Sequence, residues 1–333
     1  MNFIKSKCNK WKECENLKKT IISLGILILI VIGMICFFNK NESSNNSEKK
    51  QIITTIYPIY DFTKEIAGDK LDVSMLLSPG VEVHDYEPTP QDIIKIQNSD
   101  LFLYMGEELE PWAKTVISGI DNKENLKNVA DGISLIEKEE FEEEYGIEDD
   151  ETKGHEDEKY DTHIWLDPTK SIELVKNITK CLINVDPSNE KYYLERSQEY
   201  ISKLENLDSD FEDVVKKSSR NEIAFAGPFS YSYFIKRYGL KFVTAYDSCG
   251  ENGEPSVDKI FNVIKEIKEN NLPVVFYKEL SSGNIVRTVS DETGAIPLEF
   301  NSLHSLPKEQ MENGESYLTI MNKNLENLKK ALN

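Results

Sequence analysis

The 333-residue sequence is poor in cysteine, histidine and positive charge. It has five Cys and four His, and its 39 Lys and Arg oppose 59 Asp and Glu, which gives a formal charge of −20. Phosphate contacts need Lys and Arg, so this charge argues against a nucleic-acid-binding protein. A hydrophobic content of 39% excludes disorder throughout the chain, and the length predicts one large domain or two of medium size.

Cysteine is too sparse to build a disulfide scaffold. No C-x-x-C motif occurs, and only Cys181 and Cys249 follow residue 50. The remaining three are Cys8, Cys14 and Cys36. We therefore do not expect cysteine to be the functional residue.

The N-terminal region predicts a membrane anchor. Residues 21–38 are an 18-residue run without charge, and residues 1–20 before it contain six Lys and two Glu. This length reaches the lower end for a membrane-spanning helix, and the Lys excess predicts a cytoplasmic tail. Residues 39–50 form a polar linker to an extracytoplasmic part. An uncleaved anchor is our first interpretation, and lipidation at Cys36, whose preceding residues match poorly, is the second.

Residues 51–333 alternate short apolar runs with amphipathic segments. This pattern is typical of α/β proteins with mainly parallel sheets flanked by helices. Seven runs are predicted strands: Ile52–Tyr57, Leu71–Leu77, Leu101–Tyr104, Glu222–Ala226, Leu240–Tyr246, Pro273–Tyr277 and Ala295–Phe300.

One long helical pattern separates the strands into two groups. Its apolar residues recur at spacings of three, four and seven: Leu194, Ile201, Leu204, Leu207, Phe211 and Val214. We predict a rigid linker helix at 188–217, capped by Ser188, between an N-terminal lobe at 51–187 and a C-terminal lobe at 218–333.

Over half of the excess negative charge lies in residues 137–161. This run has fourteen Asp and Glu, three Lys and one histidine, His155. It has Gly but no apolar periodicity, so we predict an acidic loop within the N-terminal lobe. A solubilising loop is the plainer interpretation of the same pattern.

Three histidines occupy comparable places in the predicted fold. His84 follows a strand and precedes a helix that Thr89 would cap. His163 precedes a second helix, which Asp167 would cap, and His304 follows the last strand. Loops at the carboxyl ends of parallel strands form the ligand crevice of α/β sheets, so these histidines are expected to converge.

Converging imidazoles with nearby carboxylates suit a divalent transition metal. Neutral nitrogen donors favour Zn²⁺, and oxygen donors become acceptable for Mn²⁺. A lone histidine is more often a hydrogen-bonded or surface residue, and the sequence has no H-E-x-x-H motif. Placement alone leaves both interpretations open.

The sequence resembles the substrate-binding proteins of zinc and manganese ABC importers, the zinc-uptake and metal-binding adhesin-like lipoprotein family. The resemblance covers nearly all of residues 51–333. It is carried by Ile56–Phe62, Ile66–Asp69, Ser78–Pro90, Leu101–Gly106, Leu109–Trp112, His163–Pro168, Tyr192–Tyr193, Leu204–Asp208, Arg237–Leu240, Glu254–Ser256 and Met321–Leu325, in the family's order.

The resemblance implies a metal site and also departs from the family's ligand set. The family's first two metal-binding histidines match His84 and His163. Its third ligand falls on Pro228, which has no donor side chain, and its fourth falls on Asn301. The departures suggest that His304 supplies a donor from the C-terminal lobe, or that water or acidic side chains complete the shell.

The resemblance also implies the function. We expect a monomeric, membrane-anchored protein that captures Zn²⁺, or Mn²⁺, between its lobes and delivers it to an ABC permease driven by an ATPase, with no chemical step of its own. The acidic run 137–161 occupies the place of a His-rich loop in zinc-binding members. A metal-dependent hydrolase, with Asp85, Asp167 or Glu87 as base, and a surface adhesin are the alternatives.

Three more residues lie near the expected cleft. Trp112 and Trp165 follow the common pattern of core aromatics beside apolar runs. Glu279 follows a predicted strand, where it is either an acceptor behind the metal ligands or a surface carboxylate.

Overall fold

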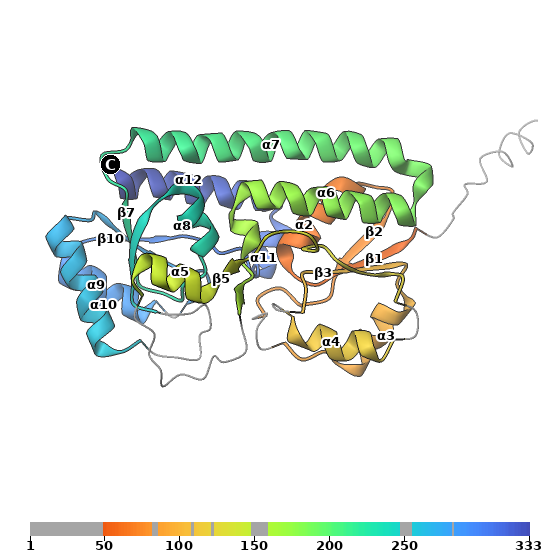
Figure 1. The fold of residues 1–333 in the computed structure, drawn as a ribbon, viewed down its shortest axis with the longest axis horizontal. Helices are drawn as coiled ribbons and strands as arrows, with labels where there is room; N and C mark the ends of the chain where they lie inside the picture. The colour runs from red at the N-terminus through yellow and green to blue at the C-terminus, as the bar shows by residue number, and fades with distance from the viewer. Residues whose placement is uncertain are drawn as a thin grey trace, which may run out of the picture. The chain divides into compact units, whose positions relative to one another are not determined.

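A computed structural model describes residues 49–81, 86–107, 110–120, 123–147, 159–246, 255–281 and 283–333. The chain divides after Lys49, and Lys50–Asn333 forms one compact unit (Figure 1). The predicted tail, the anchor segment 21–38 and most of the linker lie outside the described residues. Within the described ranges, no helix combines the length and the apolar character needed to cross a membrane.

Four short parallel strands form the first sheet, in the order β2-β1-β3-β4. The strands are β1 (Gln51–Thr54), β2 (Asp72–Met75), β3 (Leu101–Tyr104) and β4 (Leu126–Asn128). The connecting helices are α2 (Tyr57–Ala67), α3 (Pro90–Asn98) and α4 (Pro111–Ser118). All four residues of β3 are buried, as expected for a parallel strand covered on both faces. We call this sheet and its helices the first lobe.

The second lobe repeats this topology. Its parallel sheet has the order β8-β7-β9-β10, so each strand has a counterpart in the first lobe. The strands are β7 (Glu222–Phe225), β8 (Lys241–Thr244), β9 (Val274–Tyr277) and β10 (Ile296–Glu299). The connecting helices are α8 (Ser232–Tyr238), α9 (Val257–Asn270) and α10 (Asn284–Thr293).

A layer of long helices is shared by the two lobes. The helix α7 (Glu190–Lys217) packs on α6 (Pro168–Val185) along its first half and on α12 (Tyr317–Leu332) along its second (Figure 1). Its 28 residues contain no Gly or Pro and correspond to about 42 Å of helix. One face is buried at helical spacing: Tyr193, Ser197, Tyr200, Ile201, Leu204, Leu207 and Phe211. The predicted long helix is therefore confirmed.

Most predicted strands are longer than the observed ones by one to three residues, and two other differences have a clear structural reason. Tyr57, predicted as the end of a strand, begins α2, because Pro58 in the first turn has the fixed φ that favours a helix start. Ser188 was predicted to cap α7, but this was wrong. It lies in the 3-10 turn η2 (Pro187–Asn189) and donates its hydroxyl to Asp186 at 2.6 Å, while Asn189 directly precedes α7.

Part of the acidic run 137–161 is regular structure. It begins in a two-stranded antiparallel sheet, β5 (Ile136–Glu137) and β6 (Tyr160–Asp161), and continues as α5 (Lys138–Tyr145). Phe141 of α5 is buried and stacks on Phe242 of the second lobe, with ring centroids 6.0 Å apart. Tyr145 of the same helix also packs on Phe242, and these two aromatic residues were too weak a signal for a helix in the sequence. Residues 148–158, including His155, lie outside the described residues.

The chain after β10 completes the second lobe. A short helix, α11 (Lys308–Glu312), precedes α12, and a capping box at Ser316 and Thr319 begins the latter. The loop between β10 and α11 carries His304.

Candidate metal centre

His163 lies between β6 and the 3-10 turn η1 (Ile164–Leu166), on the segment that leads into α6. Asp161 Oδ1 accepts the backbone N–H of His163 at 2.8 Å and lies 2.6 Å from its Nδ1. One carboxylate oxygen therefore fixes both the backbone and the ring. An ionised carboxylate can only accept, so Nδ1 carries the proton and the ring's lone pair is on Nε2.

Asp161 remains suited to this role although it is buried. Burial acts to raise the pKa of Asp161, but the charge and hydrogen bonds of His163 outweigh it and hold the pKa below its usual value. The ionised form is thus favoured near neutral pH.

The loop that carries His304 is held by paired amides. Asn301 N–H donates to Asn324 Oδ1, and Asn324 Nδ2 donates to Asn301 O, both at 2.8 Å. Leu303 has φ 60°, in the left-handed region that few non-glycine residues adopt, and its N–H donates to Asn301 Oδ1 at 2.8 Å. Such a conformation persists only where its surroundings determine it, so His304 has a fixed place.

His304 also has an acceptor for its Nδ1. Ser302 Oγ lies 2.9 Å from that atom and donates to Glu279 Oε1 at 2.5 Å. Glu279 Oε2 accepts the backbone N–H of Ser302 at 2.7 Å. Burial raises the pKa of Glu279, while Lys278 and the bonds from Ser302 act in the opposite direction. Of the two interpretations of Glu279, the structure supports the buried acceptor, since only 4% of it is exposed.

The rings of His163, before α6, and His304, after β10, lie against each other. Their centroids are 4.5 Å apart with an interplanar angle of 83°. Trp165 packs edge-on against both, at 5.4 Å from His163 and 5.2 Å from His304, and its Nε1 donates to Ser302 O at 2.8 Å. This tryptophan is fully buried and forms one wall of the site.

The two imidazoles present the chemistry of a transition-metal site. Both Nε2 atoms are buried, and the Nδ1 of each ring faces an acceptor. Neutral imidazole nitrogen is a preferred donor for Zn²⁺. Within the described ranges, no group of three or more His, Cys, Asp and Glu side chains is arranged to hold a metal ion. His84, predicted as another ligand, lies outside the described residues.

The family's two further ligand positions do not offer donors in this structure. Pro228 is buried and has no donor side chain. Asn301 is committed to its loop, with Oδ1 accepting from Leu303 and Nδ2 donating to Glu299 Oε1 at 3.0 Å.

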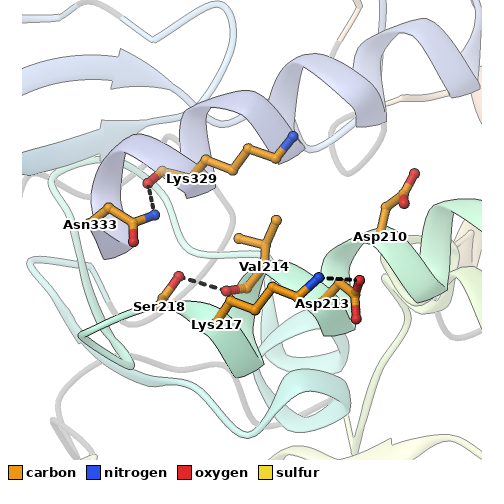
Figure 2. A pocket seen from close by; sticks show the side chains of 7 residues that line it. All are labelled: Asp210, Asp213, Val214, Lys217, Ser218, Lys329 and Asn333. Carbon is orange, nitrogen blue, oxygen red and sulfur yellow. Dashed lines mark hydrogen bonds and ion pairs between the residues drawn. The ribbon is translucent and has the colours of Figure 1, made fainter.

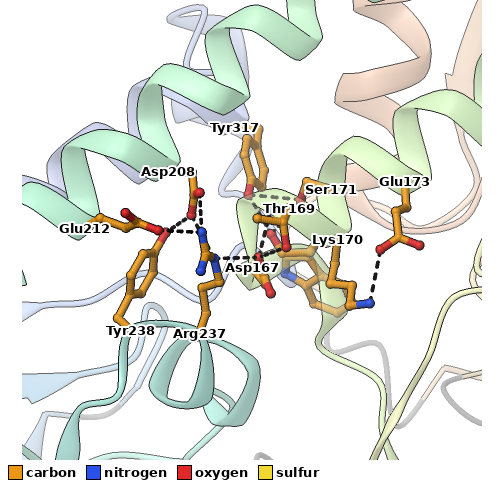
Figure 3. A network of polar contacts seen from close by, with 11 residues as sticks. Asp167, Thr169, Lys170, Ser171, Glu173, Asp208, Glu212, Arg237, Tyr238 and Tyr317 are labelled. Carbon is orange, nitrogen blue, oxygen red and sulfur yellow. Dashed lines mark hydrogen bonds and ion pairs between the residues drawn. The ribbon is translucent and has the colours of Figure 1, made fainter.

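A polar network supports the segment that carries His163 (Figure 3). Asp167 caps α6 by accepting from the backbone N–H and the hydroxyl of Thr169, both at 2.7 Å. Arg237 of α8 lies 3.9 Å from Asp167 and binds Asp208 and Glu212 of α7. The cap predicted for Asp167 is confirmed, and these contacts occupy one of the three carboxylates considered as the base of a hydrolase. Trp112, the other aromatic near the cleft, packs on Tyr86 and Phe102 of the first lobe.

A pocket of about 360 Å³ lies elsewhere, between the C-terminal ends of α7 and α12 (Figure 2). It is lined by Asp210, Asp213, Val214, Lys217, Ser218, Lys329 and Asn333. Lys217 is paired with Asp213 at 2.7 Å, and the lining contains no histidine. The pocket therefore lacks imidazole donors such as those of His163 and His304.

The acceptors behind the two histidines were missed in the sequence. Asp161 and Ser302 each precede their histidine by two residues. A polar side chain at this spacing can bond to the backbone or side chain two positions on, as Asp commonly does in turns. The two-residue spacing that both pairs share could therefore have identified Asp161 and Ser302 from the sequence.

Comparison with known proteins places this arrangement in a family. A family model described as zinc-uptake complex component A, periplasmic, matches residues 52–331. The chain is 36% identical over 294 residues to the high-affinity zinc uptake system protein ZnuA of Bacillus subtilis (strain 168), a match that covers 88% of this chain and 91% of that protein.

A second relative is longer than this chain. The zinc-binding lipoprotein AdcA of Streptococcus pneumoniae (strain ATCC BAA-255 / R6) is 31% identical over 312 residues, which span 93% of this chain and 60% of AdcA. Among solved structures, the metal-dependent lipoprotein YcdH from Bacillus subtilis aligns with a TM-score of 0.72 and 35% identity, over 85% of this chain and 99% of YcdH.

Proposed function

The chain belongs to the family of zinc-uptake complex component A, and on this premise we propose that it captures Zn²⁺ between its lobes through His84, His163 and His304. The observation that carries the proposal is the meeting of His163 and His304, whose ring centroids lie 4.5 Å apart. Each ring has its Nδ1 engaged by an acceptor, which leaves Nε2 as the ligating nitrogen.

Support for His84 as the third ligand comes from the residues near it in the sequence. Gly80, four positions before His84, donates its N–H to Ser305 Oγ at 2.8 Å. Ser305 directly follows His304. The segment leading to His84 therefore approaches the loop of the second lobe that carries a proposed ligand.

Three neutral nitrogens favour Zn²⁺ over Mn²⁺, which prefers more oxygen donors. The names of the relatives, a zinc uptake protein and a zinc-binding lipoprotein, support the same metal. His304 then replaces the donors that Pro228 and Asn301 do not supply.

The proposed role is transport without a chemical step. The protein holds Zn²⁺ on the extracytoplasmic side and passes it to a permease, whose partner ATPase drives uptake, when docking disturbs the ligand geometry. We propose that it works as a monomer, anchored through residues 21–38 or as a lipoprotein through Cys36, and the word lipoprotein in the name of AdcA supports a lipid anchor.

Metal titration of single variants tests the proposal. Residues 40–333, which include the compact unit Lys50–Asn333, are stripped with a chelator and titrated with Zn²⁺ and Mn²⁺. We expect tight, one-to-one Zn²⁺ binding that weakens by at least about 100-fold in His84→Ala, His163→Ala and His304→Ala. Unchanged affinity in any of the three variants removes that histidine from the site, and preference for Mn²⁺ contradicts the metal assignment.

A further inference from the structure

Glu279 is a buried carboxylate whose two oxygens both accept hydrogen bonds from Ser302. It follows β9 by two positions, and Ser302 supplies hydrogen bonds to both of its oxygens. The backbone N–H of Ser302 donates to Glu279 Oε2, and its hydroxyl donates to Glu279 Oε1 at 2.5 Å. Ser302 has no exposed surface.

The serine hydroxyl has a second neighbour, the imidazole of His304. Oγ lies 2.9 Å from Nδ1, but a hydroxyl has only one proton to donate. When the ionised carboxylate of Glu279 takes that proton, Ser302 Oγ must accept from His304, so Nδ1 carries the imidazole proton. The lone pair is then on Nε2, which is buried.

We infer that Glu279 and Ser302 are positioning residues that select the Nδ1–H tautomer of His304 and so make its Nε2 a zinc donor before the metal arrives. The direction of the hydrogen bonds from His304 through Ser302 to Glu279 depends on the ionised carboxylate, which can only accept. In Glu279→Gln, the side-chain oxygen accepts the Ser302 N–H, and the amide donates to Ser302 Oγ. The hydroxyl proton then turns to His304 Nδ1, which places the imidazole proton on Nε2.

The first lobe offers a matched control. Glu110 follows β3, the counterpart of β9, has no exposed surface and accepts the backbone N–H of Met105 at 2.7 Å. Glu110→Gln makes the same chemical change beside the equivalent strand, and the hydrogen-bond partners of Glu110 among the described residues, Met105, Thr55 and Gly106, include no histidine.

The test uses the full chain labelled with ¹⁵N-histidine, metal-free at pH 8, where imidazoles are neutral. The ¹⁵N shifts of His304, assigned by their loss in His304→Gln, report its tautomer. We expect Nδ1–H in the parent and in Glu110→Gln, and Nε2–H in Glu279→Gln. Zn²⁺ affinity should fall about 10-fold in Glu279→Gln and stay at the parent value in Glu110→Gln.

Ser302→Ala provides a second variant should Glu279→Gln fail to fold. It removes the hydroxyl and keeps the backbone bond to Glu279, and its Zn²⁺ affinity should fall about 3-fold to 10-fold because Nδ1 loses its acceptor. Nε2–H in the parent, or the parent's tautomer in Glu279→Gln, overturns the inference. The inference rests on the proposed function only for its affinity readout. Absence of Zn²⁺ binding by the parent defeats the proposed function and leaves the tautomer result standing.

Discussion

The two lobes have the same strand order and the same order of connecting helices, but the two histidines that we propose as ligands are held differently. In the segment entering α6, the charged Asp161 contacts His163 Nδ1 directly at 2.6 Å. In the second lobe, a neutral hydroxyl stands between His304 and the carboxylate of Glu279. His163 follows β6 of the small antiparallel sheet, whereas His304 follows β10 of the second parallel sheet. The residues next to each histidine, rather than the shared topology, therefore decide how firmly its imidazole is held.

The largest expected effect is the pH dependence of Zn²⁺ affinity. Its size depends on how many histidines bind the metal. With a reference pKa of about 6.5, each ligating histidine should weaken binding about 10-fold between pH 7.5 and 5.5. If His163 and His304 both bind the metal, Zn²⁺ affinity should fall about 100-fold over this range. If His84 is a third ligand, it should fall about 1,000-fold. Competition calorimetry with a chelator measures this. Affinity that does not change with pH contradicts ligation by histidine.

The buried carboxylates that follow β3 and β9 provide a second comparison, through stability. Burial raises the pKa of Glu110 from 4.5 to about 7. The folded state therefore keeps the proton longer than the unfolded state. Stability from this group is complete below about pH 4.5 and declines until about pH 7, by about 3 kcal/mol.

Urea unfolding across this pH range checks the prediction. Glu110→Gln should lose this part of the decline, whereas the parent and Ser302→Ala should both retain it. An identical pH profile for Glu110→Gln and the parent would show that Glu110 titrates normally in the folded protein.

Asp161 contacts His163 directly, whereas Glu279 acts on His304 through Ser302. Loss of these two kinds of support should lower Zn²⁺ affinity by different amounts. Asp161→Asn removes a charge-assisted bond and should weaken Zn²⁺ binding by about 10-fold to 100-fold, more than Ser302→Ala. Asp61→Asn is the matched control. This buried aspartate accepts from the hydroxyls of Tyr57 and Tyr200 and from the backbone of Tyr317, and none of these partners is a histidine. Calorimetric Zn²⁺ titration of the three variants ranks their affinities. A larger loss of affinity in Ser302→Ala than in Asp161→Asn would contradict this prediction.

The smallest expected effect concerns the caps of α3 and α9, equivalent helices in the two lobes. Thr89 accepts from the N–H of Asp92, which bonds back to the Thr89 backbone, so both partners of a capping box are present. Ser256 makes one cap bond, to the N–H of Lys259. Thr89→Ala should cost about 1–2 kcal/mol of unfolding free energy and Ser256→Ala about 0.5–1 kcal/mol. Chemical denaturation measures both, and equal losses would remove the distinction.

Much of the fold followed from local sequence signals. Apolar runs gave the seven longer strands of the two sheets, and Gly-free periodicity gave α7. The three residues of β4 are only partly buried and include Lys127 and Asn128, so they showed no strand pattern. The helix α5 depends on the contact of Phe141 with Phe242, a hundred residues away, which no local pattern contains.

The site was predictable in outline and not in detail. Placement after strands and before helices led to His163 and His304, which the structure brings together. The strand order that the two lobes share could not be seen in the sequence. The two halves match only in a short Glu-Pro-Thr or Glu-Pro-Ser motif before α3 and α9. The relay through Ser302 to Glu279 joins residues 23 positions apart, and it exists only because β9 and β10 are neighbours in the sheet.

Anomalous diffraction at the zinc edge, on crystals of the zinc-loaded protein, tests the central claim most directly. The account predicts one strong zinc peak between the lobes, about 2.0–2.1 Å from Nε2 of both His163 and His304. A zinc peak at any other place, or one bound by only one of these two imidazoles, would contradict it.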